Sequence, residues 1–235
     1  KVNMKATMKG LMKNKPLIWI LVASLLFMMN TMLMGTVNVY LFKDYFQSTA
    51  ALSIFAIVQT GACFVAMPLV KPLVAKFGKK ELASAGLVLS AIMYFVLFFM
   101  KDLTGMQFVA VASIGMFGYA FFNIVVWAFV TDVIDYHELL TGLREDGTVY
   151  SIYSFARKIG QAIAGGIGGF AIGAVGYNAV SGVQSQSTLD GIHMLGTLVP
   201  AICFVIVLLV LVFLYPLNKK RTDEMVAELT ARRNK

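Results

Sequence analysis

Residues 132–161 read DVIDYHELLTGLREDGTVYSIYSFARKIGQ, a charged stretch inside a strongly apolar chain. Its charged side chains are Asp132, Asp135, Glu138, Arg144, Glu145, Asp146, Arg157 and Lys158. Of the 235 residues in the chain, 59% are hydrophobic and only 14% are charged, and the mean hydropathy is +0.78. Soluble globular domains are about half apolar. The stretch is therefore expected to connect two membrane segments, with Arg157 and Lys158 already inside the second segment.

Six long apolar runs surround this stretch, at residues 17–42, 52–74, 82–100, 106–133, 149–175 and 192–217. A helix of about 20 apolar residues crosses the roughly 30 Å hydrocarbon core of a lipid bilayer. Helices of soluble proteins alternate apolar and polar faces, whereas these runs are apolar nearly all round, so a large soluble helical core is the weaker alternative. The sequence predicts an all-α, polytopic membrane protein with six transmembrane helices.

Lysine and arginine are unevenly distributed between the two sides of these runs. Sixteen of the twenty lie on one side, namely Lys1, Lys5, Lys9, Lys13, Lys15, Lys71, Lys76, Lys79, Lys80, Arg144, Lys219, Lys220, Arg221, Arg232, Arg233 and Lys235. Lys43 and Lys101 lie on the other side, and Arg157 and Lys158 lie within the fifth run. This positive-inside bias places both termini in the cytoplasm. The net charge of +8 is thus a topology signal, and no nucleic-acid partner is expected.

The domain organisation predicted from these patterns has three parts: a cytoplasmic lead-in segment at 1–16, a six-helix bundle at 17–217 and a cytoplasmic tail at 218–235. Cys63 and Cys203 lie within apolar runs without disulfide or metal-ligand spacing, so no metal site is expected. The chain begins with Lys1 instead of Met, and we expect it to be part of a longer protein. Six spans with both ends on one side fit one half of a transporter whose substrate site lies between two six-helix halves.

The fifth run carries a polar stripe on one helical face. In a helix that starts near Thr148, this face holds Ser151, Ser154, Lys158, Gln161 and Gly165. Lys158 then lies about 15 Å along the helix, close to the middle of the bilayer. A lysine at that depth is costly and is expected to face a partner or a water-filled cavity; the alternative is that it snorkels to the interface. Arg157 points about 100° away and is interpreted as a structural ion pair or a snorkelling side chain.

Two further features of the apolar runs involve small or amide residues. Gly165, Gly169 and Gly173 form two overlapping GxxxG steps, which predict close packing against another helix. Asn123 lies deep in the fourth run, with Trp127 one turn nearer the cytoplasm. Because a buried amide must be hydrogen-bonded, Asn123 is interpreted as a helix–helix contact or as a group that binds the substrate.

Asp132, Asp135 and Glu138 form an acidic cluster at the cytoplasmic end of the fourth run. One interpretation is an ionic latch made with Arg144 and with a partner half, and this is the interpretation we favour. The other is a Mg²⁺–diphosphate site, as in membrane prenyltransferases. That chemistry normally needs two facing acidic clusters, because the metal must be held with positions left open for phosphate oxygens. The sequence offers no second cluster.

With these residues in view, the chain resembles the second half of the melibiose-permease-like transporters, the glycoside–pentoside–hexuronide:cation symporters of the major facilitator superfamily. The specific match is the block DVIDYHELLTGLREDGTVYSIYSFARKIGQAI at 132–163. KNKPL at 13–17, GYN at 176–178 and YPL at 215–217 before a basic tail also match. The resemblance covers essentially the whole chain and implies helices 7–12 of a 12-helix transporter.

The resemblance implies sugar uptake driven by Na⁺ or H⁺ and no cofactor beyond that coupling cation. By position, Lys158 matches a functional lysine near the sugar and cation sites, and Ser154 matches a position in the sugar pocket. Asp132, Asp135 and Arg144 match a charged network that closes the cytoplasmic side. At Asn123 melibiose-type members can carry an aromatic residue, so the amide here suggests a different specificity.

We therefore expect a substrate and cation pathway formed by Lys158, Ser154, Ser151, Gln161, Asn123 and Trp127, and a cytoplasmic gate formed by Asp132, Asp135 and Arg144. The expected partners are a sugar or glycoside, a second six-helix half that this chain lacks, and the lipid bilayer, which we expect to be the bacterial inner membrane. Two alternatives stay open at this point. One is a membrane-embedded Mg²⁺-dependent transferase that uses Asp132, Asp135 and Glu138, and the other is a half-size transporter that dimerises.

Overall fold

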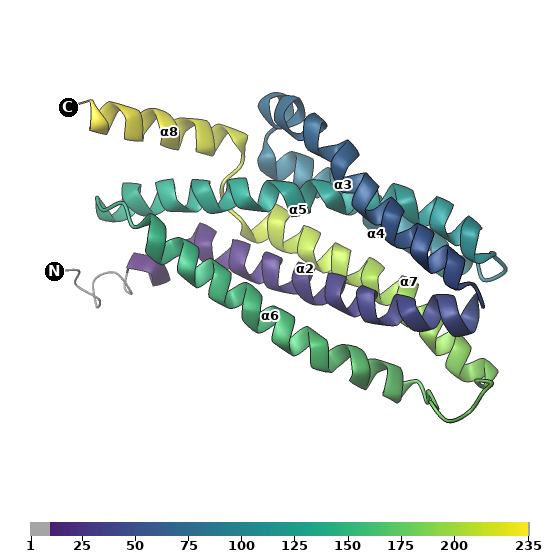
Figure 1. Cartoon of the computed structure of the whole chain (residues 1–235). Coiled ribbons are helices and arrows are strands. Elements are labelled where there is room, and N and C mark those ends of the chain that lie inside the picture. The colour runs from purple at the N-terminus through teal and green to yellow at the C-terminus, as the bar shows by residue number, and fades with distance from the viewer. Residues whose placement is uncertain (1–9, 235) are drawn as a thin grey trace.

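A computed structural model describes residues 10–234 and shows a bundle of long helices without a strand in that range (Figure 1). The helices are α2 (Lys15–Tyr40), α3 (Thr49–Phe77), α4 (Lys79–Phe99), α5 (Gly105–Thr141), α6 (Asp146–Ala174), α7 (Gln186–Leu209) and α8 (Lys219–Arg233). One turn of π-helix extends α2 over Leu41–Tyr45, and another extends α7 over Val210–Leu214. The predicted all-α fold is confirmed.

Five helices in the described range are long and apolar enough to cross a membrane: α2, α3, α4, α5 and α7. The remaining candidate, α6, has 29 residues and is long enough, but it is the most amphipathic of the helices from α2 to α7. Arg157, Lys158 and a polar face lower its mean hydropathy, so the expected apolar surface all round is wrong for this run. That α6 spans the bilayer stays a prediction.

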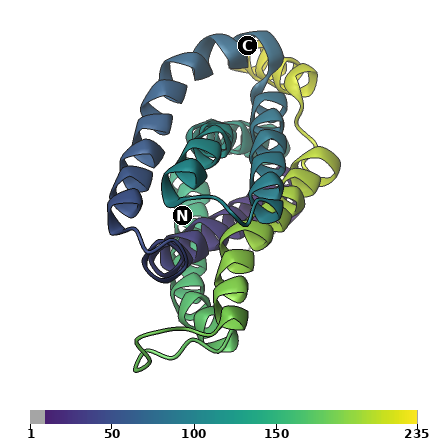
Figure 2. The ribbon, with the colours of Figure 1, turned by 90° about the vertical axis from the view of Figure 1, so that its right-hand side faces the viewer.

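Aromatic side chains from α2, α5 and α7 meet in the core of the bundle. The ring of Phe27 lies 4.6 Å from that of Phe122 and 6.3 Å from that of Phe204, measured between centroids. The ring of Tyr119 stacks on Phe204 at 5.6 Å. Figure 2 shows α3 bowed outward from this core, and Pro68 and Pro72 lie in the second half of that helix. Proline removes a helix hydrogen bond and is the usual cause of a bend.

Helices α4 and α5 approach so closely that backbone touches backbone. A Cβ atom on Gly86 would lie 2.2 Å from the carbonyl oxygen of Gly118. The Ser90 hydroxyl bridges the same contact, because its Oγ lies 2.8 Å from the carbonyl oxygen of Gly115 and 2.9 Å from that of Gly86. Glycine therefore sets the spacing of these two helices.

Helices α2 and α6 are held together by a different set of small residues than the sequence predicted. Gly160, Ala164 and Gly168 are buried, and Cβ atoms on the two glycines would contact Leu25 and Thr36 of α2. A Cβ atom added to Gly165, Gly169 or Gly173 would meet nothing within 4 Å among the described residues. These three glycines make no close contact among the described residues, because the α2-facing seam lies on the neighbouring face of α6; their close packing against another helix stays a prediction.

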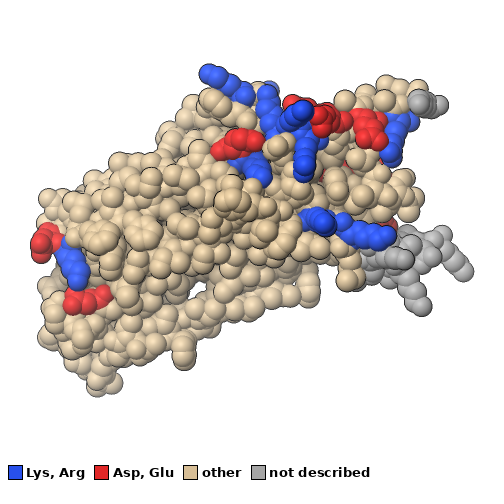
Figure 3. Space-filling view, turned by 180° about the vertical axis from the view of Figure 1, so that it is seen from behind, with Lys and Arg blue, Asp and Glu red and all other residues tan. Residues whose placement is uncertain are grey.

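Charged side chains gather at one end of the bundle, which we call the basic end and define as the turn at Gly78, the connection 142–145 and α8 (Figure 3). Both described ends of the chain lie toward it (Figure 1). Lys80 ties the start of α4 to the segment between α7 and α8, since its Nζ donates to the carbonyl oxygen of Tyr215 at 2.7 Å. Of the predicted lead-in segment 1–16, residues 1–9 lie outside the described residues, and so do Lys1, Lys5, Lys9 and Lys235 of the charge pattern.

Candidate functional site

A cavity of about 500 Å³ lies between α2, α3, α5 and α6. Its volume is within the usual range of small-molecule sites, roughly 300–1,000 Å³. The lining residues are Phe27, Met28, Thr31, Met32, Gln59, Thr60, Cys63, Phe64, Met67, Tyr119, Asn123, Arg157 and Gln161. The bowed course of α3 leaves this space open beside α5, while α4 and α7 take no part in its lining. The cavity is thus built from four helices around a partly aromatic wall.

Several groups in this cavity can donate or accept hydrogen bonds. Gln59 Nε2 donates to the Tyr119 hydroxyl oxygen at 2.8 Å, which leaves the hydroxyl proton of Tyr119 available to a ligand. Asn123 is exposed on the cavity wall. Gln161 reaches toward α2, where its Nε2 lies 3.8 Å from the sulfur of Met28. A set of neutral donors and acceptors beside aromatic surface suits a polyhydroxylated ligand.

Arg157 also lines the cavity, although the sequence pattern supported only a structural or snorkelling interpretation for it. Its guanidinium carbon lies 5.0 Å from the ring centroid of Trp127 and 5.9 Å from that of Tyr153. Distances below about 6 Å are typical of attractive cation–π contacts. Trp127 is thus placed next to the cavity through Arg157. Arg157 and Gln161 are four residues, or about one helical turn, apart and so share a face of α6. This spacing could have predicted that Arg157 lines the cavity.

Only part of the polar stripe predicted on α6 lines the cavity. Gln161 lines the cavity, but Ser151, Ser154 and Lys158 do not. Ser151 and Lys158 are exposed in this chain, and Ser154 is half-buried. Successive residues of a helix are rotated by about 100°, so Arg157 and Lys158 cannot face the same way. Within the described residues, Arg157 takes the cavity-facing position.

Arg144 organises a charged cluster at the basic end, between the C-terminal part of α5 and the first turn of α6. Its guanidinium donates to Asp135 at 2.8 Å, to Glu138 at 2.9 Å and to Asp146 at 2.9 Å. Hydrogen bonds to Asp135 and then to Glu138 raise the pKa of Arg144 above its ordinary value. Arg233 of α8 also binds both oxygens of Glu138, so the tail helix is tied to α5.

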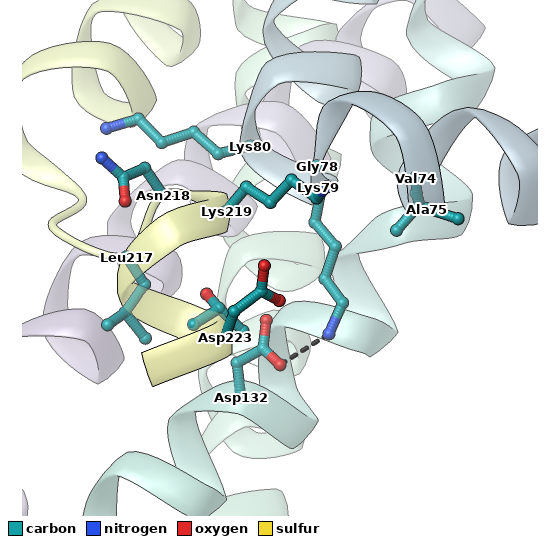
Figure 4. Close-up of a pocket in the computed structure, with 11 residues that line it drawn as sticks. Val74, Ala75, Gly78, Lys79, Lys80, Asp132, Leu217, Asn218, Lys219 and Asp223 are labelled. Atoms are coloured by element: carbon teal, nitrogen blue, oxygen red, sulfur yellow. Dashed lines mark hydrogen bonds and ion pairs between the residues drawn. The ribbon is translucent and has the colours of Figure 1, made fainter. Parts of the chain in front are cut away.

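Asp132, the third predicted gate residue, belongs to a separate ion pair. Its carboxylate lies 2.5 Å from Nζ of Lys79 at the start of α4, and its side chain is only 5% exposed. Figure 4 shows this pair in a pocket between the α3–α4 turn, α5 and α8, with Asp223 nearby. The structure therefore brings Asp135 and Arg144 together and assigns Asp132 to Lys79. Lys79 was missed because the sequence showed it only as one of several basic loop residues.

Asp132, Asp135 and Glu138 form ion pairs with side chains of the same chain. Within the described range, no group of three or more His, Cys, Asp or Glu side chains could hold a metal ion. Asp135 and Glu138 are both engaged by Arg144. The geometry of a Mg²⁺–diphosphate site is therefore not formed by Asp132, Asp135 and Glu138.

The chain is similar along most of its length to known membrane transport proteins. A family described as MFS/sugar transport protein matches residues 1–219. A protein of Escherichia coli K12 provisionally named as a sulfoquinovose importer is 32% identical over 96% of this chain and 48% of its own length. The glucuronide carrier protein homolog of the same organism is 32% identical over 98% of this chain and 50% of its own length. The uncharacterized symporter YjmB of Bacillus subtilis is 28% identical over 97% of this chain and 50% of its own length. The chain spans about half the length of these curated relatives.

Proposed function

This chain belongs to the MFS family of sugar transport proteins, and on that premise we propose that it forms one half of a secondary active transporter for a sugar or glycoside. The family match confirms the resemblance noted from the residues and places the chain among transporters instead of enzymes. Five apolar helices and the family match make it an integral membrane protein. The proposal includes its organisation as a six-helix bundle at 17–217, with a lead-in segment at 1–16 and a tail at 218–235.

The observation that carries the proposal is the cavity between α2, α3, α5 and α6. It combines the aromatic surface of Phe27 and Tyr119 with the polar groups of Asn123 and Gln161. Sugars present apolar ring faces and many hydroxyl groups, so a site for them needs both kinds of surface. We propose that Asn123 and Gln161 bind sugar hydroxyls, and that a second six-helix half closes the open side of the cavity.

The polar groups outside the cavity receive a different role in this proposal. In this proposal the exposed Lys158 and Ser151 and the half-buried Ser154 face the second half, where they contribute to the pathway of the coupling cation, Na⁺ or H⁺. Trp127 supports this region through its contact with Arg157. Lys158 has no ion pair with a described residue, which is expected if its partner lies in the other half.

We further propose that the basic end faces the cytoplasm of a bacterium and that Asp135 and Arg144 help to close this side. The excess of Lys and Arg at that end supports the orientation. In the full-length transporter, Arg144→Ala should increase labelling of a cysteine placed at position 151 by a membrane-impermeant reagent added from the cytoplasmic side. Unchanged labelling in a folded variant would argue against the gate.

The transport proposal is tested by uptake into membrane vesicles that contain the full-length transporter. A glycoside should accumulate only when a Na⁺ or H⁺ gradient is imposed. Asn123→Ala and Gln161→Ala should each raise the apparent KM about tenfold, because losing a hydrogen bond to the ligand costs about 1–1.5 kcal/mol. Gln186→Ala, at the opposite end of the bundle, is the matched control. Absence of saturable uptake, or equal KM values in all variants, would refute the proposal.

A further inference from the structure

Arg157 is a cation at mid-helix that has no carboxylate partner among the described residues. It lies 11 residues after the start of α6, or about 16 Å along the helix axis. All 12 Asp and Glu residues of the chain lie within the described range, and none of the ion pairs formed there includes Arg157. Its ring contacts, to Trp127 and Tyr153, fix its position without neutralising its charge.

The surroundings of Arg157 are otherwise neutral. Among the described residues that line the cavity, Arg157 is the only charged one. The polar side chains beside it are amides, hydroxyls and a thiol, such as Asn123, Gln161 and Cys63. A site of this composition attracts a negative charge and offers additional hydrogen bonds to neutral polar groups.

The cost of placing the guanidinium of Arg157 within the bilayer favours an anionic ligand as its partner. A charged side chain within a bilayer is costly and is kept where it faces a water-filled cavity or meets a partner. A guanidinium is always protonated and presents a planar fork of N–H donors that fits a carboxylate or a sulfonate in a bidentate manner. Such a fork discriminates strongly between a ligand that carries the anionic group and one that lacks it.

We propose that Arg157 recognises the acidic group of the transported sugar, so that the preferred substrate carries one carboxylate or sulfonate. This inference rests on the proposed sugar transport. Trp127 and Tyr153 hold the guanidinium against the cavity wall, and the neutral amides next to it bind the hydroxyl groups of the same ligand. Neutral sugars lack the group that satisfies Arg157 and bind more weakly.

The test compares p-nitrophenyl β-D-glucuronide, the corresponding 6-sulfonate glycoside and p-nitrophenyl β-D-glucoside, which differ only at C6. Binding to the purified full-length transporter is measured by calorimetry. The unmodified protein should bind at least one of the two acidic glycosides about tenfold or more tightly than the glucoside. Arg157→Gln should remove this preference and leave the Kd of the glucoside within about twofold. Arg157→Lys keeps the charge without the fork, so an intermediate preference is expected.

Arg232→Gln is the matched control, because it makes the same change on exposed α8 and should alter no Kd. Equal affinity of the unmodified protein for all three glycosides would overturn the inference, and this comparison needs no variant to fold. So would an Arg157→Gln protein that keeps its preference, or one that loses affinity for acidic and neutral glycosides alike. If the glucoside binds and is transported without any preference for acidic glycosides, sugar transport stands and only the role of Arg157 fails. If no glycoside binds, the proposed function fails as well.

Discussion

The ion pair of Lys79 and Asp132 shows how one buried carboxylate is stabilised in an apolar helix. Asp132 lies on α5, where burial disfavours its charge, and the ammonium of Lys79 offsets that penalty at 2.5 Å. Lys79 reaches it because α4 begins directly after the sharp turn at Gly78, whose φ of 107° suits glycine. The first residue of one helix is thereby fixed against the side of another.

We predict that Lys79→Ala destabilises the protein by about 3–5 kcal/mol, since removing one partner leaves an uncompensated buried charge. Replacing both residues, with Lys79→Met and Asp132→Leu, should cost much less for the same reason. The measurement is thermal unfolding in detergent. Lys220→Ala is the control, because its pair with Glu224 is solvent-exposed and exposed pairs contribute only about 0–1 kcal/mol. Equal melting temperatures for Lys79→Ala and the parent protein would contradict the account.

Individual site residues could be predicted only where a polar side chain occurs within an otherwise apolar run. Asn123 and Gln161 are amides in apolar runs, and the structure places both on the cavity wall. Arg157 and Lys158 are adjacent and chemically alike, so the choice between them depends on the rotation of α6. That rotation is set by the buried seam of Gly160, Ala164 and Gly168 against α2, which residue type alone did not reveal.

At the scale of the helices, spacing is controlled by small residues at a few contact points. At the α4–α5 contact, a Cβ on Gly86 or Gly118 would run into the backbone of the other helix, and a Cβ on Gly115 would meet the ring of Tyr94. Ser90 satisfies its hydroxyl within the same contact. Lipid provides no hydrophobic driving force between membrane helices, so van der Waals packing at close approach and interhelical hydrogen bonds contribute to their association.

Gly86→Ala should therefore destabilise the protein by about 1–3 kcal/mol, the usual cost of overpacking a closely packed core. The same substitution at Gly165, where a Cβ meets nothing within 4 Å in the described residues, should be neutral or slightly stabilising, since alanine favours helix more than glycine. Both values can be obtained from chemical unfolding in mixed micelles. A larger loss for Gly165→Ala than for Gly86→Ala would show that the contact has been assigned to the wrong face.

The existence of the helices was predictable, whereas their contacts were not. Long apolar runs identified α2, α3, α4, α5 and α7 because a bilayer demands about 20 apolar residues in sequence. The GxxxG steps at Gly165, Gly169 and Gly173 were as regular as the seam actually used, at Gly160, Ala164 and Gly168. The choice between two such faces of one helix depends on its neighbours, and these are brought together only by the tertiary fold.

Across the whole molecule, some basic side chains form ion pairs with carboxylates of the same chain and others do not. At the basic end, Arg144, Arg233 and Lys79 are bound to carboxylates of α5. Arg157 and Lys158 of α6 have no such partner in the described residues; Arg157 lines the cavity, whereas Lys158 is exposed outside it. Two mid-helix cations without a carboxylate partner in the described residues suit a bundle that acts against a second bundle.

Lys158 provides the last prediction, which concerns coupling between sugar and cation in the full-length transporter. We expect Lys158→Ala to abolish uphill accumulation of a neutral glycoside under a Na⁺ or H⁺ gradient, because an exposed ammonium on α6 can hold a carboxylate of the other half until a cation replaces it. Arg should substitute poorly, since its planar fork cannot replace a compact ammonium. Exchange of glycoside at equal concentrations should persist, because the cavity residues are unchanged.

Accumulation of the glycoside is measured in cells and normalised to membrane-inserted protein. Lys43→Ala is the control, and Arg157→Ala is expected to have a milder effect on this neutral substrate. If Lys158→Ala accumulates the glycoside as well as the parent protein does, Lys158 is a snorkelling charge and coupling must be assigned to other residues.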